Sequence, residues 1–186
     1  MTNIEFKARR RSFTKIHSVL TQRQIALTAT LRQTDTYFHA PHGRLKLREI
    51  NEETAQLIFY QRPDLAEVKR SDYLIAPVAS SAALCEVLGA AYGIRTVVKK
   101  TRELYLLPRQ FGASAGRAAP DLIRLHLDAV EGRGFFLEIE VILQKGESPQ
   151  IAEQEAKFWL QEFGIAPEDL LSGSYADLGA SNRALR

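Results

Sequence analysis

The chain has 186 residues, of which 45% are hydrophobic and 25% charged, the composition of an ordinary globular protein with enough apolar residues for a core. The formal net charge of +3 does not require a nucleic-acid partner, and a single cysteine, Cys85, excludes an intramolecular disulfide and argues against a cysteine-based zinc site. The sequence contains no apolar run of transmembrane length and no apolar signal segment, so we expect a cytoplasmic protein with no membrane partner.

The first third of the sequence predicts strands around one helix. Residues 2–9 alternate between polar and apolar side chains, which is the period of a strand. Residues 13–31 carry isoleucine and leucine at near-helical spacing, so we expect a helix there. Further strands are expected at residues 35–39, 43–48 and 55–62.

The remaining sequence predicts a second helix, a long strand, a hairpin and a third helix. The elements expected in order are a polar loop at 64–71, a helix at 82–92 capped by Ser80 or Ser81 and ended by Gly93, a strand at 94–106, a flexible loop at 108–120, a hairpin at 124–140, and a helix from Ser148-Pro149 to Phe163. The tail at 167–178 is expected to hold a short helical turn and an extended stretch at 174–177. We expect one domain over residues 1–178 and a frayed tail at 179–186.

The predicted hairpin has one face rich in ionisable groups. Two runs of strict alternation flank a Gly-Arg-Gly turn, and successive side chains of a strand point to opposite faces. The polar face carries Arg124, His126, Asp128, Glu138 and Glu140, with Phe136 beside them. The pattern alone is as compatible with a structural histidine as with a functional one.

Several predicted strands share this division into a charged and an apolar face. The charged pairs are Glu5/Lys7, Lys46/Arg48, Lys100/Arg102, Arg124/Asp128 and Glu138/Glu140. One interpretation is an antiparallel sheet with a solvated face. The other is a closed barrel with a polar lumen and an apolar outer wall covered by helices, which leaves no exposed strand edges. The sorting of positive and negative residues onto different strands favours the barrel, in the α+β fold class.

A lumen of this composition has a natural ligand. Closely spaced lysines and arginines suit a polyanion, whereas the carboxylates would repel one unless a hard cation lay between them. Mg²⁺ or Mn²⁺ bound through oxygen ligands bridges carboxylate and phosphate groups. The combination therefore indicates a metal–polyphosphate complex. A nucleic-acid-binding face is the weaker hypothesis, because it gives no reason to place Glu5, Glu138 and Glu140 there.

At this point the sequence resembles the CYTH superfamily, the triphosphate tunnel metalloenzymes. The matching segments occur in family order, at residues 3–9, 33–38, 43–49, 60–62, 69–73, 98–105, 126–132, 136–140 and 174–175. They are more similar to the bacterial proteins labelled class IV adenylate cyclase than to the thiamine triphosphatases. The resemblance implies an eight-stranded antiparallel closed β-barrel with a polar lumen and helices packed outside it.

The resemblance also implies roles for particular residues. As catalytic residues it indicates Lys7, Arg62, Lys100, Arg102 and Asp128; as substrate-binding residues Lys46, Arg48, Lys69, Arg124 and Tyr175; and as ligands of Mg²⁺ or Mn²⁺ Glu5, Glu138 and Glu140. Asp128 would hold a basic neighbour in place or assist at a second metal, and Tyr175 would close over the tunnel or cap it. One position departs from the family signature Glu-x-Glu-x-Lys, because Asn3 stands where the first glutamate is expected.

Three functions follow from the resemblance and this departure. The first is metal-dependent hydrolysis of a triphosphate, either inorganic triphosphate or a nucleoside triphosphate. The second is a class IV adenylate cyclase that converts ATP to cyclic AMP and pyrophosphate. The third, suggested by Asn3, is a phosphoanion-binding module without turnover. The expected partner is a small molecule with a triphosphate rather than a nucleic acid or a membrane, and the resemblance implies a homodimer.

Overall fold

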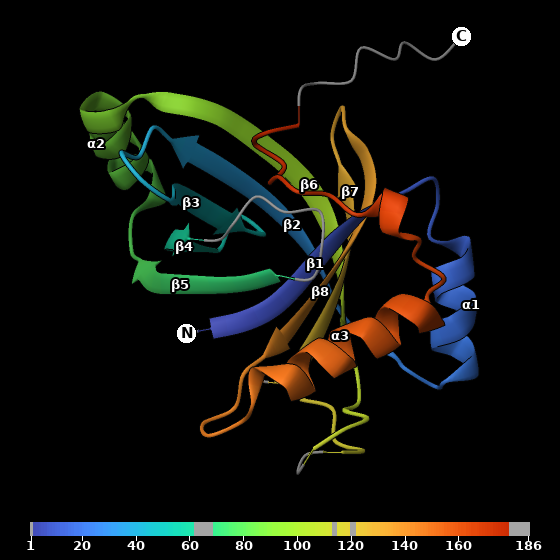
Figure 1. Cartoon of the computed structure of the whole chain (residues 1–186). Coiled ribbons are helices and arrows are strands. Elements are labelled where there is room, and N and C mark those ends of the chain that lie inside the picture. Colours follow the sequence, from blue (N-terminus) through green and yellow to red (C-terminus); the bar gives the residue numbers. More distant parts are fainter. Residues whose placement is uncertain (1, 62–68, 113–114, 120–121, 179–186) are drawn as a thin grey trace, which may run out of the picture.

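The described part of the chain folds into a closed barrel of eight antiparallel strands with three α-helices outside it (Figure 1). The computed structural model describes residues 2–61, 69–112, 115–119 and 122–178. The strands are β1 (Thr2–Arg10), β2 (Leu27–Phe38), β3 (Arg44–Ile50), β4 (Thr54–Gln61), β5 (Lys69–Val78), β6 (Ile94–Leu106), β7 (Ile123–Val130) and β8 (Gly134–Ile142). Their order around the barrel is β1-β5-β4-β3-β2-β6-β7-β8, and β8 pairs with β1 to close it. The predicted α+β barrel is confirmed.

The alternation along the strands sorts the side chains between the lumen and the outer wall. On β1, Glu5 and Lys7 face the lumen, whereas Ile4 and Phe6 belong to the hydrophobic core outside it. The lumen residues are nevertheless buried, since Lys7 is only 4% exposed and Asp35 is 0% exposed. The charged faces therefore line an interior space and are not a solvated side of an open sheet.

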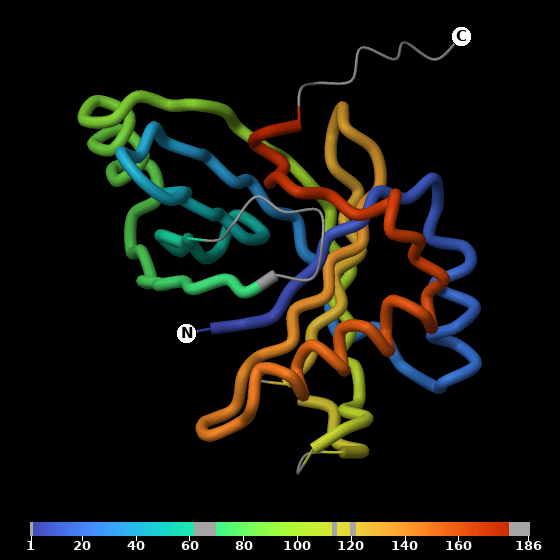
Figure 2. Tube along the Cα trace, viewed as in Figure 1, coloured from blue at the N-terminus to red at the C-terminus, as the bar shows by residue number. Residues whose placement is uncertain are grey.

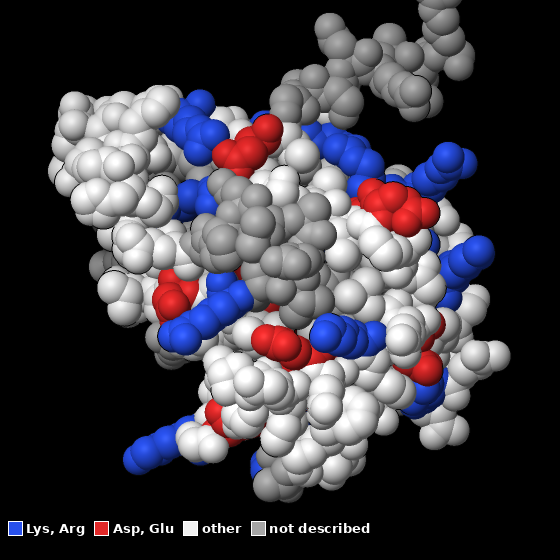
Figure 3. Space-filling model, in the orientation of Figure 1, with Lys and Arg blue, Asp and Glu red and all other residues white. Residues whose placement is uncertain are grey.

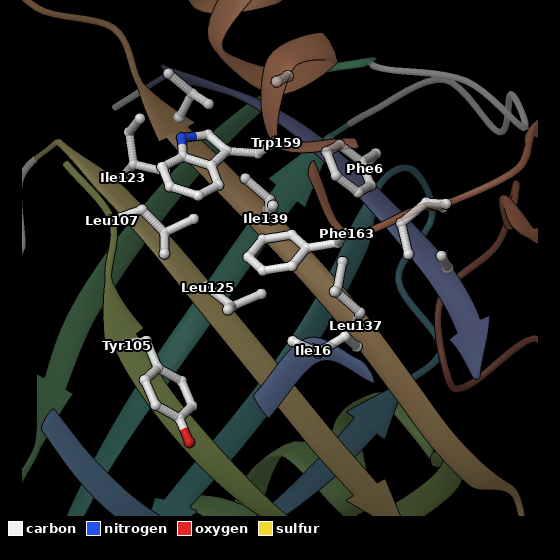
Figure 4. Close-up of a cluster of buried hydrophobic side chains, with 14 of the residues drawn as sticks. Phe6, Ile16, Tyr105, Leu107, Ile123, Leu125, Leu137, Ile139, Trp159 and Phe163 are labelled. Atoms are coloured by element: carbon white, nitrogen blue, oxygen red, sulfur yellow. The ribbon is translucent and has the colours of Figure 1, made fainter. Parts of the chain in front are cut away.

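The main hydrophobic core lies between the outer wall and two helices, α1 (Thr14–Gln22) and α3 (Pro149–Glu162). The apolar faces of β1, β7 and β8 supply Phe6, Leu125 and Ile139, and α3 covers them with Trp159 (Figure 4). Ser148 caps α3 by accepting a hydrogen bond from the backbone N–H of Gln150, with Pro149 in the first turn. This packing fixes the strands whose inner faces carry the glutamates of the lumen.

Removal of one methylene group from this core tests how much its packing contributes to stability. Ile139 is fully buried, so Ile139→Val leaves a small cavity and is expected to lower the free energy of unfolding by about 0.5–1.5 kcal/mol. Urea unfolding followed by circular dichroism measures this. The matched control is Ile94→Val on β6, where the side chain is 50% exposed and the same change should be nearly neutral. Equal effects at the two positions would contradict this packing.

The third helix, α2 (Ser81–Tyr92), covers a smaller cluster on another part of the barrel. Leu84, Cys85 and Leu88 of α2 pack against buried residues of β2, β3 and β4, namely Phe38, Leu47 and Ala55. The helix ends as predicted at Gly93, which has a φ of 74° that other residues rarely adopt. None of the helices in the described part of the chain is long and apolar enough to span a bilayer.

Three predicted elements in the first half of the chain are wrong in their type or limits. The helix expected over residues 13–31 ends at Gln22, and the strand expected at 35–39 begins at Leu27. The cause is that Leu27 and Leu31 fit helical spacing as well as they fit a strand. The loop predicted for residues 64–71 overlaps the start of β5, a strand that was not predicted from the sequence. Pro77 and an unbroken apolar run take the place of the alternation that indicates a strand. Arg62 and the tail at 179–186 lie outside the described residues.

The segment after α3 returns to the barrel (red in Figure 2). A short 3₁₀ turn, η1 (Pro167–Asp169), confirms the expected helical turn, and Leu170 then forms an isolated bridge with Ala8 of β1. The extended stretch predicted at 174–177 is instead a turn, in which the N–H of Asp177 donates to the carbonyl of Ser174. This turn places Tyr175 at one end of the lumen.

Candidate active site in the barrel lumen

The lumen contains a cavity of about 250 Å³ that is lined by residues of all eight strands and by Ser174 and Tyr175. Its charged lining includes Glu5, Lys7, Lys46, Arg48, Lys100, Arg102, Arg124, Glu138 and Glu140. The residues come from strands far apart in the sequence, and the closed barrel brings them to one space. In contrast, the outer face in Figure 3 shows basic and acidic side chains interspersed.

One cluster of cations is organised around Asp35 on β2. Arg48 lies opposite Asp35 on β3 and donates two hydrogen bonds to its carboxylate, from Nε at 2.6 Å and from Nη2 at 2.7 Å. Lys46, two residues before Arg48 on the same face, donates to the same carboxylate at 3.1 Å. Burial alone would raise the pKa of Asp35, but the charges of Arg48 and Lys46 hold it well below its usual range.

A second cluster repeats this arrangement around Asp128 on β7. Arg102 lies opposite Asp128 on β6 and donates from Nε at 2.6 Å and from Nη2 at 2.7 Å. Lys100, two residues before Arg102, donates at 3.2 Å and also lies 4.0 Å from Asp35, which links the two clusters. Burial acts against the charged form of Asp128, yet Arg102 and Lys100 hold its pKa well below the usual value.

The two clusters crowd four cations, and this lowers the pKa values of the lysines. Burial, followed by the nearby charge of Arg48, lowers the pKa of Lys46 to about 8. Burial and the charge of Arg102 likewise hold the pKa of Lys100 well below its usual range. The two aspartates restrain this repulsion but do not cancel it. An anion in the lumen would therefore be attracted strongly.

Tyr175 closes one end of the cavity. Its hydroxyl donates to Asp128 at 2.7 Å, and the Nζ atom of Lys7 lies 4.0 Å from the centre of its ring, a cation–π contact. The ring packs with Phe136 and Tyr37 in an apolar cluster inside this end of the barrel. Tyr175 is 3% exposed, so the residue predicted to cap the tunnel is part of a packed plug in this structure.

The remaining carboxylates lie on β8, facing β1 and β7. Glu138 accepts from Lys7 at 2.7 Å and from Arg102 at 3.0 Å, and Glu140 pairs with Arg124 at 2.7 Å. His126 of β7 lies directly opposite Glu138. Burial and the charge of Arg102 lower the pKa of His126 to about 4, so its imidazole is neutral at pH 7.

The structure brings together the predicted site residues whose side chains it describes. Lys7, Lys46, Arg48, Lys100, Arg102, Arg124, Asp128, Glu5, Glu138, Glu140 and Tyr175 line the lumen or bond to residues that do. Lys69 begins β5 opposite Glu5, with a side chain that the structure does not describe, and Arg62 lies outside the described residues. The sequence-based site omitted Asp35, although its alternation with Gln33 and Tyr37 was a usable signal.

The comparisons with known proteins agree with this architecture. The sequence model of the CYTH domain matches residues 1–175. The PH1012 protein of Pyrococcus horikoshii OT3 is similar in structure, with a TM-score of 0.78 and 23% identity over 95% of this chain and 98% of that one. A putative adenylate cyclase from Vibrio parahaemolyticus has a TM-score of 0.71 and 16% identity, over 94% and 95% of the two chains.

A protein from Hippeastrum is a more distant structural neighbour. It is a putative adenylyl cyclase described as having a dominant triphosphatase activity, with a TM-score of 0.56 and 17% identity over 94% of this chain and 92% of that one. No curated protein matches the sequence. At these identities the solved structures support the fold and not a particular reaction.

Proposed function

The chain belongs to the CYTH domain family, and on this basis we propose that it binds a triphosphate in the barrel lumen and hydrolyses it with the help of a divalent cation. The observation that carries the proposal is the convergence of Lys46, Arg48, Lys100 and Arg102 on one enclosed space. Buried cations at this density are stabilised by an anion of high charge, such as a chain of phosphate groups.

The ion pairs that line the lumen in the absence of substrate explain why a divalent cation is expected as well. Lys7, Arg102 and Arg124 are already paired with Glu138 or Glu140. When phosphate oxygens take these cations as partners, the buried Glu138 and the half-buried Glu140 are left without them, which is unfavourable. A divalent cation held by the glutamates restores the charge balance.

The residues present fit such a cation. Ligand atoms of His126, Glu138 and Glu140 lie within 4.8 Å of one another, and the buried Nδ1 atom of His126 has no hydrogen-bond partner among the described residues. We propose that Glu138 and Glu140 hold the cation, with Glu5 nearby, opposite Glu140 on β1. When bound, Mg²⁺ or Mn²⁺ supplies charge neutralisation of the phosphate oxygens and orients them.

The protein side chains supply the positioning that phosphoryl transfer requires. A guanidinium has five N–H donors, so Arg48 and Arg102 retain donors for phosphate oxygens while Asp35 and Asp128 hold them in place. In hydrolysis of inorganic triphosphate, the oxygen of water forms a bond to the terminal phosphorus, the phosphoanhydride bond breaks, pyrophosphate leaves with the electron pair, and the proton of the water passes to solvent. Positioning and charge stabilisation account for most of the rate in reactions of this kind.

Product analysis tests this proposal. The purified protein is incubated with inorganic triphosphate or with ATP, each with Mg²⁺ or Mn²⁺, and the products are separated by chromatography. Orthophosphate together with pyrophosphate or ADP is the expected result. Formation of cyclic AMP and pyrophosphate from ATP would show that the protein is a cyclase and not a hydrolase. Binding of triphosphate without any product would show that it is a phosphoanion-binding module.

The lowered pKa of Lys46 predicts an alkaline limit to activity. Lys46 is a cation below its pKa of about 8 and neutral above it, so its attraction for phosphate is lost as the pH rises through this value. The pH dependence of kcat/KM reflects the ionisation of groups in the free enzyme, so we expect kcat/KM to decrease above pH 8, with a limiting slope of about tenfold per pH unit. Lys46→Arg keeps its charge at these pH values and should move the limit upward. An unchanged limit in this variant would assign it to another group.

The asparagine at position 3 predicts a gain of function. Asn3 is buried in the lining, and its Oδ1 atom accepts no hydrogen bond within the described parts of the chain. Asn3→Glu adds a carboxylate on the face of Glu5, so we expect tighter cation binding and turnover raised about tenfold, the effect of about 1.4 kcal/mol. Asn3→Gln is the neutral control. If Asn3→Glu leaves turnover unchanged, the natural asparagine does not limit the site.

A further inference from the structure

The imidazole of His126 is buried against two carboxylates, at distances longer than those of an ordinary hydrogen bond. Its Nδ1 atom lies 3.5 Å from Oε2 of Glu138 and 3.8 Å from Oε1 of Glu140. The residue is 5% exposed, and no described group forms a hydrogen bond with Nδ1. All three residues belong to the β7–β8 hairpin, whose register sets His126 directly opposite Glu138.

An unpartnered nitrogen in this place is costly unless something occupies the space between the three side chains. Leaving a buried polar atom unsatisfied costs about 1–3 kcal/mol. In the tautomer that carries its proton on Nε2, the Nδ1 atom directs a lone pair at carboxylates, which only accept hydrogen bonds, and the two repel each other. A cation between them reverses the sign of both interactions, because the lone pair and the two carboxylates then all face a positive charge.

We propose that His126 is a direct ligand of the divalent cation and, with Glu138 and Glu140, forms a mixed nitrogen–oxygen site. This inference extends the proposed function, which requires a cation but not a nitrogen ligand. The neighbouring cations do not prevent binding, since Lys7, Arg102 and Arg124 are the groups expected to turn to phosphate when a triphosphate is bound.

A nitrogen ligand makes the site selective between cations. Mg²⁺ prefers an octahedral shell of oxygen atoms and gains little from imidazole. First-row transition metals accept imidazole readily, and Mn²⁺ also retains its preference for carboxylates. The site therefore binds Mn²⁺ more tightly than Mg²⁺, and His126 accounts for the difference.

The test measures the cation directly and requires no turnover. Electron paramagnetic resonance of the full chain with MnCl₂ and a methylene-bridged triphosphate, which is not hydrolysed, gives the affinity, and spin-echo modulation detects a ¹⁴N nucleus bound to Mn²⁺. We expect nitrogen modulation in the wild type, which disappears in His126→Gln while the affinity for Mn²⁺ falls about 10- to 100-fold and that for Mg²⁺ changes less. His39→Gln, at an exposed histidine after β2, is the matched control and should keep the wild-type signal.

Several results would overturn the inference. Absence of nitrogen modulation in the wild-type complex would exclude an imidazole ligand, and its persistence in His126→Gln would exclude this one. Selective ¹⁵N-histidine labelling of the wild type makes the same test without a variant, should His126→Gln fail to fold. A nitrogen-bound Mn²⁺ in a protein that hydrolyses no triphosphate would sustain this site and refute the proposed function. Hydrolysis of triphosphate without nitrogen modulation would support the proposed function and refute the His126 ligand.

Discussion

Glu140→Gln is expected to lower kcat for triphosphate hydrolysis about 10³-fold. The substitution keeps the shape of the side chain but removes one of the negative charges proposed to hold the divalent cation. Polarisation of phosphate by a bound cation contributes several kcal/mol to transition-state stabilisation, and about 4 kcal/mol corresponds to this factor. Because Arg124, the partner of Glu140, is partly exposed, loss of the pair should leave the barrel folded.

The control for this prediction is Glu131→Gln, in the turn between β7 and β8. Glu131 is an exposed carboxylate on the same hairpin, so its removal changes the net charge equally without touching the lumen. Turnover is measured as orthophosphate release over a range of Mn²⁺ concentrations, with circular dichroism as the check on folding. Wild-type turnover in folded Glu140→Gln would show that the proposed cation site is wrong.

Asp128→Asn is expected to lower the free energy of unfolding by about 3–5 kcal/mol. Asp128 is fully buried, bonds to Arg102 and Lys100, and accepts from Tyr175. Removing one partner of a buried ion pair is strongly destabilising, because it leaves the opposite charges buried and uncompensated. The neutral amide also introduces N–H donors that face other donors.

Binding of inorganic triphosphate should restore much of the stability that Asp128→Asn loses. A ligand present at 100 times its Kd stabilises any folded protein by about 2.7 kcal/mol, and the gain should be larger in Asp128→Asn because phosphate replaces the missing negative charge. Urea unfolding with and without triphosphate measures both effects. Asp72→Asn is the control, since its pair with Arg70 is exposed and worth less than about 1 kcal/mol. A similar small loss in both variants would contradict the anchoring role of Asp128.

The strict alternation of charged and apolar residues made the barrel predictable. Strand β6 (Ile94–Leu106) has the limits expected from its sequence, and β7 and β8 lie within a residue or two of the predicted hairpin. In contrast, β5 has no clean alternation and contains Pro77, so neither of the usual signals was present. The first half of β2 was mistaken for helix because leucines four residues apart satisfy both periods.

The membership of the site was more predictable than its internal contacts. Alternation and the family resemblance identified Lys100 and Arg102 as lumen residues and offered Asp128 as the holder of a basic neighbour, but they did not indicate that Asp128 holds both cations. The role of Asp35 as the matching anchor depends on its register with Arg48 on β3, which no pattern within one strand reveals. The same holds for His126, whose position between two glutamates follows from pairing across the hairpin.

The repeated Asp–Arg–Lys clusters explain how the barrel remains folded with buried cations in its lumen before a substrate binds. Each aspartate binds an arginine through two hydrogen bonds and a lysine through a third, with nearly equal distances in the two clusters. This arrangement fixes the planes of the guanidinium groups in advance. Binding then requires less reordering of side chains, which is the general advantage of a preorganised site.

Hydrolysis of a triphosphate in the lumen is tested most directly by ³¹P nuclear magnetic resonance of inorganic triphosphate with Mg²⁺. Wild-type protein and Glu140→Gln, purified in parallel, are compared in the same buffer. We predict that the wild type converts triphosphate to orthophosphate and pyrophosphate in equal amounts, and that Glu140→Gln shows almost no conversion over the same time. Equal conversion by both proteins, or by neither, would contradict the proposed hydrolysis.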